Sequence, residues 1–259
     1  MVWGHQFVLV GASNDDYAKE SIILAVAPII KGDDDKGSEN AVAIHEVARL
    51  KTENPGFAAL LYDKALRGTM VNKIWAMGLQ PIIPVYDKTK LRTNEEFICA
   101  KTINGIRVLI YAIDGAFQIE SHDGYFPLKI KKLETRINKK DRTHRWYGTY
   151  EISSEIPCDF RLHVQTILLR TDKEGERELG EYIRAHNPKG EHFRALYGRR
   201  NEAESVNAMM KSHLGPNRRA RSYGRQKVWI DIMFQSMLRN HEAMLHHRAR
   251  IRDPISQPA

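Results

Sequence analysis

Four residues with chemically useful side chains recur at spacings that would place them on one side of a helix. They are Tyr197, Arg200, Glu204 and Lys211, within the stretch YGRRNEAESVNAMMK. At about 100° per residue, the four positions fall within an arc of roughly 60°. This stripe is either a solvated helix face, with Arg200 and Glu204 as a weakly stabilising i,i+4 pair, or one wall of a site for a metal ion and a phosphate.

Spacing alone favours the solvated face, since charged stripes are common on surface helices, and support for the second interpretation comes from a family pattern. Tyr, two residues, Arg, three residues, Glu, six residues, Lys resembles the signature of bacterial insertion-sequence DDE transposases, which have an RNase H-like catalytic domain and a β-rich insertion. The resemblance implies that Glu204 is the last of three metal-binding carboxylates. It also implies that Arg200 and Lys211 contact transposon-end DNA, that Tyr197 supports the site, and that a complete site holds two ions of Mg²⁺ or Mn²⁺.

A second candidate carboxylate, Asp63, directly follows the apolar run FAALLY, which predicts a short buried strand. A helix closed by Gly78 and a strand at residues 81–85 would complete a βαβ unit with parallel strands. Ligands gather at the carboxyl ends of such strands, where Asp63 is expected to lie. The segment LLYDKALRG also resembles the second-aspartate motif of the family, which implies that Asp63 and Glu204 are catalytic metal ligands.

The first aspartate of the family has no counterpart that we can assign. The start WGHQFVLV resembles the strand after the one that carries this aspartate, so the resemblance implies the C-terminal part of a catalytic domain, truncated at its N-terminus. Asp15 and Asp16 follow the strand in a turn rather than in the expected place. The run Asp33 to Asp35 is interpreted as a solvated loop. Whether the chain is active without an upstream aspartate stays open.

The remaining patterns suggest where elements begin and end. Strands are predicted at residues 5–10 and 22–30, and a helix with Ser38 as its N-cap should end near Asn54. Short alternating runs at 106–112, 117–120, 145–152 and 162–169 predict an antiparallel β region. Polar and amphipathic helices are predicted at 174–185, from about 192, and at 225–248. Core candidates of the β region are Val108, Ile110, Trp146, Tyr150, Val164, Ile167 and Leu169.

Basic charge is concentrated at the end of the chain. The net charge is +8, and residues 187–259 hold 14 Lys and Arg against 6 Asp and Glu, while residues 1–186 hold 26 of each. A local excess of this kind attracts a phosphate backbone. The DNA-binding candidates are therefore Arg200 and Lys211 together with Arg218, Arg219 and Arg221. The basic stretch 129–142 fits DNA contact and solvated hairpin turns equally well.

Other features of the composition exclude several classes of protein. No long apolar window or leader pattern indicates a membrane span or signal peptide, so we expect a cytoplasmic protein. The resemblance implies that it is bacterial and nucleoid-associated. Cys99 and Cys158 form no zinc or disulfide pattern and are interpreted as packing residues. The apolar residues of the last helix are interpreted as core, and His241, His246 and His247 as part of a fraying basic terminus.

Together these observations predict an α/β protein with an RNase H-like core of mixed sheet and helices. The expected segments are 1–89 for the first part of the core, 90–170 for the β-rich insertion and 171–259 for the helical part. The predicted function is DDE transposition of double-stranded DNA, at terminal inverted repeats and target DNA, by a protein that dimerises when synapsed. A non-catalytic DNA-binding protein that competes for transposon ends, and a nuclease of the same metal chemistry, remain alternatives.

Overall fold

The computed structural model divides the chain into two compact units, which are described separately. The first unit contains residues 1–55 and 198–259, and the second contains residues 56–197. The structure describes residues 6–12, 17, 20–30, 37–63, 65–84, 95–103, 105–113, 116–121, 124–140, 142–152, 166–170, 180, 182–183, 186, 190–213 and 224–252.

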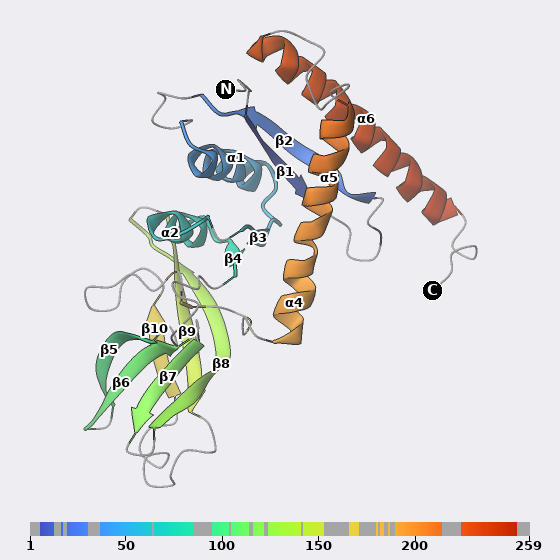
Figure 1. Cartoon of the computed structure of the whole chain (residues 1–259). Coiled ribbons are helices and arrows are strands. Elements are labelled where there is room, and N and C mark those ends of the chain that lie inside the picture. Colours follow the sequence, from blue (N-terminus) through green and yellow to red (C-terminus); the bar gives the residue numbers. More distant parts are fainter. Residues whose placement is uncertain are drawn as a thin grey trace. The chain divides into compact units, whose positions relative to one another are not determined.

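The first unit is built on a two-stranded sheet covered by helices (Figure 1). Strand β1 (Phe7–Ala12) pairs antiparallel with β2 (Ile22–Pro28). Helix α1 (Glu39–Glu53) packs against both strands, and helix α6 (Arg225–Arg252) packs against β2 and against α5 (Arg200–His213). A small apolar cluster joins the elements: Ile23, Met210, Val228 and Ile232 are buried there, with Phe7, Leu9, Val26, Val206 and Met209 beside them.

Helix α1 begins and ends where the sequence predicts. The hydroxyl of Ser38 accepts a hydrogen bond of 3.2 Å from the backbone N–H of Ala41, which satisfies one of the free donors of the first turn. Asn54 is the C-cap, and its backbone N–H donates to the carbonyl of Leu50. Val42 and Val47 are almost fully buried, as the helical periodicity requires.

The second unit begins with the predicted βαβ arrangement. Strand β3 (Ala59–Leu61) pairs parallel with β4 (Gln80–Ile82), and helix α2 (Thr69–Ala76) connects them. The parallel pairing is confirmed, and the helix begins only at Thr69. The reason is local: Gly68 has a φ of 52°, a left-handed conformation that a helix cannot continue through. Gly78 follows the helix with a φ of 80°, as expected of a terminating glycine.

The rest of this unit is a six-stranded antiparallel sheet with the order β10-β9-β8-β7-β6-β5. The predicted antiparallel region is confirmed. Two of its strands were not predicted: β5, whose residues are partly charged, and β8, which contains much of the basic stretch 129–142. Helix α4 (Glu191–Gly198) comes at the end of the unit, whereas the predicted helix 174–185 lies largely outside the described residues. The strands are β5 (Glu95–Ile103), β6 (Ile106–Ile113), β7 (Ala116–Ser121), β8 (Gly124–Ile137), β9 (His144–Ile152) and β10 (Thr166–Arg170).

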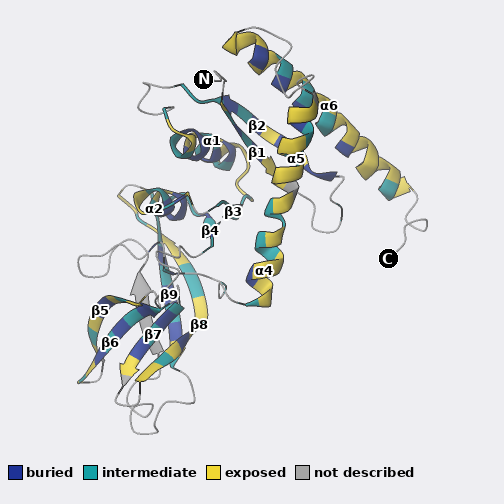
Figure 2. Ribbon diagram, viewed as in Figure 1, coloured by how far each residue is buried: buried dark blue, intermediate teal, exposed yellow. Residues whose placement is uncertain are grey.

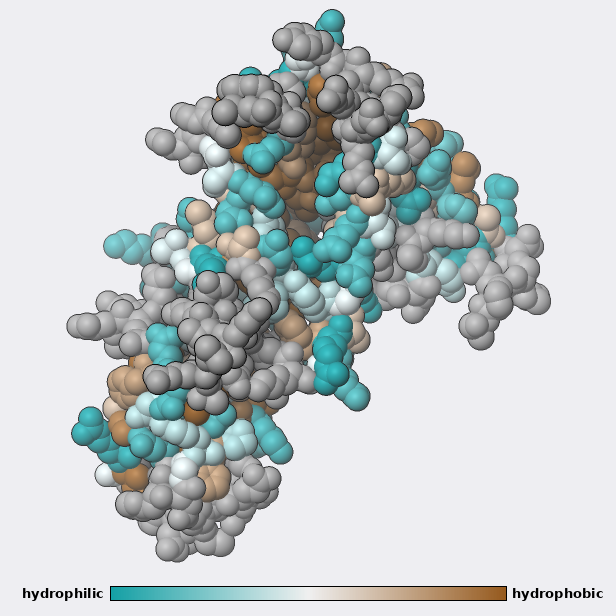
Figure 3. Space-filling view, in the orientation of Figure 1, coloured by the Kyte–Doolittle hydropathy of each residue, from teal (hydrophilic) through white to brown (hydrophobic). Residues whose placement is uncertain are grey.

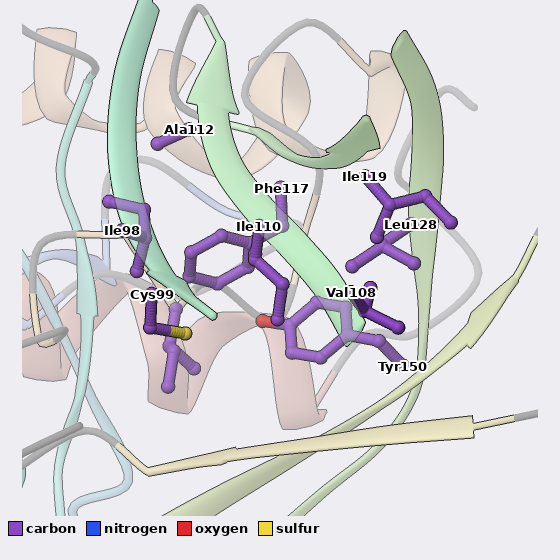
Figure 4. Close-up of a cluster of buried hydrophobic side chains, with 10 residues drawn as sticks. Ile98, Cys99, Val108, Ile110, Ala112, Phe117, Ile119, Leu128 and Tyr150 are labelled. Atoms are coloured by element: carbon purple, nitrogen blue, oxygen red, sulfur yellow. The ribbon is translucent and has the colours of Figure 1, made fainter. Parts of the chain in front are cut away.

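One face of this sheet carries the main apolar core of the unit. Figure 4 shows the side chains from β5, β6, β7, β8 and β9 that converge there. Phe117 and Tyr150 meet edge to face, with ring centroids 5.2 Å apart. Of the predicted core residues, Val108, Ile110, Trp146 and Tyr150 are buried. Val164 and the side chains of Ile167 and Leu169 lie outside the described part, and Cys99 is a buried free thiol, as expected of a packing residue.

Helix α6 differs from its prediction as a core helix. Only four of its residues are buried, namely Val228, Ile232, Ser236 and Ala243, and Figure 2 shows exposed positions along most of its length. Met233 and Met244 are each more than a third exposed, and Met237 is 63% exposed. The helix contacts the unit through a narrow stripe because the sheet beneath it has two strands.

The described structure is therefore mixed α/β, with parallel and antiparallel pairing in separate sheets. This agrees with the predicted class, while an RNase H-like arrangement stays a prediction. The predicted boundaries at 89/90 and 170/171 also stay predictions. The compact units divide after Pro55 and after Tyr197. All six strands of the antiparallel sheet lie within the predicted insertion at 90–170.

Candidate nucleic-acid interface and carboxylates

Asp63 lies two residues after strand β3, at its carboxyl end, as the sequence predicts. Its side chain is half-buried, and Oδ1 accepts a hydrogen bond of 2.8 Å from the backbone N–H of Ala65. This is an Asx turn, in which the side chain substitutes for a backbone acceptor and turns the chain away from the strand.

The stretch 197–211 forms two helices and not the single helix that the spacing suggested. Helix α4 ends at Gly198, Arg199 is a turn residue, and α5 begins at Arg200. Glycine weakens a helix because it has the largest backbone entropy to lose, which accounts for the break. Tyr197 is therefore on α4, where its ring stacks on that of Phe193 with centroids 5.7 Å apart.

The remaining three residues of the stripe share helix α5. Arg200 and Glu204 form an i,i+4 ion pair of 2.8 Å, and their side chains are 33% and 57% exposed. Lys211 is exposed near the end of the helix. Since the pair is largely solvated, its contribution to stability is small, at about 0.3 to 0.5 kcal/mol. The carboxylate of Glu204 faces solvent, while Val206 and Met210 of the same helix face the apolar cluster.

The predicted site residues are divided between the two compact units. Asp63 and Tyr197 belong to the unit of residues 56–197, whereas Arg200, Glu204 and Lys211 belong to the other. Among the described residues, no three or more His, Cys, Asp or Glu side chains are grouped in a way that could hold a metal ion. Outside the described residues lie Arg218, Arg219, Arg221, Asp15, Asp16 and Asp33 to Asp35.

The basic stretch 129–142 lies in the hairpin of β8 and β9, two neighbouring strands of the six-stranded sheet, which we call the basic ribbon. The turn between the strands is closed by the N–H of Asn138, which donates to the carbonyl of Thr143 at 2.8 Å, and it includes Arg142 at a φ of 56°. From residue 129 to residue 151 the chain has eight Lys and Arg against three Asp and Glu. The stretch is thus mainly strand, with turn residues confined to its tip.

Acidic side chains of this basic ribbon are matched by cations, and a positive excess remains. Lys131 contacts Glu151 at 2.7 Å, while Lys132 and Arg136 both contact Glu134. The hydrogen bond from Lys132, with further help from Arg136, holds the pKa of Glu134 below its ordinary value. All three cationic side chains are more than half exposed. These side chains give this part of the sheet an exposed positive surface.

A buried carboxylate that sequence reasoning missed ties the end of α6 to the sheet of the first unit. The side chain of Glu20, only 5% exposed, contacts Arg250 through both oxygens, at 2.5 and 3.0 Å, and His247 at 2.9 Å. Arg250 also lies over the ring of Tyr17, and its hydrogen bond to Glu20 raises its pKa. The interpretation of this terminus as fraying is wrong, because α6 continues to Arg252.

That cluster had a partial signal in the sequence. Histidine and arginine three residues apart on a helix present two hydrogen-bonding side chains to one point. Their partner lies more than 200 residues away, and spacing cannot identify it. Nearby, the side-chain amide of Asn240 bonds both the N–H and the carbonyl of Ile23. Polar contacts thus hold the exposed helix on β2 where apolar burial is limited.

The chain was compared with known protein families, curated proteins and solved structures. No protein-family model, curated protein or solved structure matches the chain. None of the helices that the structure describes is long and apolar enough to cross a membrane.

Proposed function

We propose that this chain is a DNA-binding protein of the DDE transposase type, in which Asp63 and Glu204 are metal-binding carboxylates for phosphodiester cleavage and transfer. The position of Asp63 is the observation that carries the proposal. It follows a strand of a parallel βαβ unit at the carboxyl end, where the α/β fold gathers ligands. The complete Tyr, Arg, Glu and Lys spacing from residue 197 to residue 211 supports it independently.

The donor chemistry suits a hard divalent cation. Asp63 and Glu204 supply carboxylate oxygens, which Mg²⁺ and Mn²⁺ prefer. When bound, two such ions stabilise the charge that develops on the attacking and leaving oxygens of an in-line displacement at phosphorus. Arg200 contacts the Glu204 carboxylate at 2.8 Å, which would give a phosphate a cation beside the same carboxylate. Lys211 adds a further positive charge on the same helix.

The DNA-binding part of the proposal depends on two basic surfaces. One is helix α5 with Arg200 and Lys211, and the other is the basic ribbon of β8 and β9. Each Lys or Arg that neutralises a phosphate releases a counterion, so binding should weaken steeply with salt. Replacing both Lys139 and Lys140 at the ribbon tip with Gln should lower the slope of log affinity against log salt by about 1 to 2.

Metal binding tests the carboxylates directly. We expect the full chain to bind Mn²⁺, measured by the loss of the free-ion electron paramagnetic resonance signal. Asp63→Asn and Glu204→Gln should each weaken this binding by about tenfold or more. Glu242→Gln is the matched control, since Glu242 is a half-exposed carboxylate on α6 that also pairs with an arginine. Equal Mn²⁺ binding by all three variants would refute the site, as would strand transfer on terminal inverted-repeat DNA that survives Asp63→Ala.

The ion pair of Glu204 also favours a second candidate, a DNA-binding protein without catalysis that competes for transposon ends. A carboxylate engaged by Arg200 in solvent has a structural role without any metal. This candidate predicts that DNA binding is unchanged by Glu204→Gln and independent of divalent cations. The transposase proposal predicts instead that Mn²⁺ strengthens DNA binding by the native chain and not by the Glu204→Gln variant.

A further inference from the structure

A row of aromatic rings crosses the outer face of the six-stranded sheet. Phe97 on β5, Tyr111 on β6 and Tyr125 on β8 follow one another, with ring centroids 5.5 and 5.1 Å apart. Successive rings are turned by 70° and 69°, the edge-to-face arrangement that aromatic pairs prefer. The surface in Figure 3 shows apolar residues among hydrophilic ones over this part of the chain.

Two carboxylates border these rings. The hydroxyl of Tyr111 donates to Glu120 at 2.9 Å, and that of Tyr125 donates to Glu95. The hydrogen bond to Glu120 raises the pKa of Tyr111, and the bond to Glu95 raises the pKa of Tyr125 to about 12. Both hydroxyls therefore stay protonated at neutral pH and hold the carboxylates beside the rings. We call these five residues the acidic aromatic patch.

The patch faces solvent because the opposite face of the same sheet is the one that packs the core. Ile98, Val108 and Ile110 alternate with patch residues along β5 and β6 and are buried. Phe97 is 43% exposed and Tyr125 is 37% exposed. The core therefore does not explain why large aromatic rings occupy these positions, and aromatic residues are enriched at protein interfaces.

We propose that the acidic aromatic patch binds arginine side chains of an extended partner peptide. A guanidinium group is attracted to the face of an aromatic ring and forms strong hydrogen bonds with a carboxylate, and the patch offers both within one surface. Nucleic acid fits the patch less well, because the phosphates would meet Glu95 and Glu120. The net charge of the chain is +8, which repels a cationic peptide. Attraction of such a peptide must therefore come from the local negative charge of the patch.

The position of the patch suits an extended peptide. Glu95 and Phe97 are two residues apart on β5 and share its outer face. An extended peptide also presents every second side chain to one side. A partner with alternating arginines matches both the spacing and the charge.

Fluorescence anisotropy with the full chain tests the proposal. The probe is a labelled peptide with arginine at every second position, and its matched control carries citrulline, which is neutral and nearly the same shape. We expect the arginine peptide to bind at least several-fold more tightly. Phe97→Ala should weaken binding by about two- to fivefold, as the loss of one exposed cation–π contact predicts. The double change of Glu95→Gln and Glu120→Gln should weaken it by about three- to tenfold.

Two further variants make the test specific to the patch. Glu151→Gln removes a carboxylate that is 48% exposed on the same sheet but outside the patch, and it should change binding less than about twofold. Tyr125→Phe keeps the ring and should bind better than Tyr125→Ala, which separates a contact role from a folding defect. Equal binding of both peptides, or equal effects of Glu151→Gln and the patch variants, would overturn the proposal. So would competition by a single-stranded oligonucleotide whose own binding is weakened by Phe97→Ala.

Discussion

The contact between Trp75 and Trp146 joins the βαβ unit to the six-stranded sheet, and Trp146→Phe should loosen it measurably. Both indoles are buried, and their rings meet edge to face with centroids 4.9 Å apart. The indole N–H of Trp146 donates to the carbonyl of Trp75 at 2.8 Å, and that of Trp75 donates to Gly180 at 2.8 Å. Trp146→Phe therefore removes a hydrogen bond that holds α2 against β9.

The structure sets the size of the effect. In the Trp146→Phe variant the Trp75 carbonyl keeps one partner, because the N–H of Gly78 also donates to it at 2.9 Å. The lost hydrogen bond therefore costs about 1 kcal/mol and not the full cost of an unsatisfied buried carbonyl. The smaller ring leaves space in a packed region, which adds about 1 to 2 kcal/mol. Native-state hydrogen exchange should show the free energy of opening for β9 lowered by about 2 to 3 kcal/mol.

The same chemical change at an exposed tryptophan is the control. Trp229 is 37% exposed on α6, and its N–H lies 3.3 Å from the carbonyl of Val26. Trp229→Phe should change the protection of α6 by less than about 1 kcal/mol. If Trp146→Phe lowered the protection of β9 by no more than this, the indole contact would not be what holds α2 on the sheet.

Three other perturbations test local features of the two units. Ser38→Ala should reduce the protection of α1 by about 1 kcal/mol in hydrogen exchange, since the N-cap acceptor is lost, whereas Ser38→Asp should preserve it. Gly78→Ala should lower the midpoint of thermal unfolding, because φ is 80° and an added Cβ would lie 2.9 Å from the imidazole of His144; an unchanged midpoint would contradict this. Glu95→Gln should return the pKa of Tyr125 from about 12 toward its ordinary value of 10.0, measured by ultraviolet titration of tyrosinate. The contribution of that raised pKa to stability is complete below pH 10.0 and is lost as the pH rises toward about 12. A tyrosinate titration unaffected by Glu95→Gln would exclude the hydrogen bond as the cause of the raised pKa.

Much of the local structure follows from the sequence because its causes are local. Ser38 caps α1 through a bond to a residue three positions away, and the parallel pairing of β3 with β4 follows from a short connection through one helix. The alternation along β6 and β9 identifies buried Val108, Ile110, Trp146 and Tyr150. Strand β8 was not predicted, because its lysines and arginines resemble a solvated turn when the neighbouring strand is not considered.

The candidate site residues were also predicted only as far as local spacing reaches. The spacing from Tyr197 to Lys211 predicts a helical stripe, but Gly198 falls within it, and the structure divides the stretch between α4 and α5. Spacing places Arg200 and Glu204 side by side correctly, because one helical turn separates them. A site that combines Asp63 with Glu204 depends on residues more than a hundred positions apart, and helical spacing carries no information about such pairs.

The sequence alone determined the secondary structure of α1, the βαβ unit and most of the antiparallel strands, together with the basic charge that favours DNA. Only the tertiary structure decided which polar side chains meet. It places Glu20 against Arg250 and His247, and it brings Phe97, Tyr111 and Tyr125 into one row. Local patterns follow from backbone geometry over a few residues, whereas these contacts arise when distant strands and helices pack together.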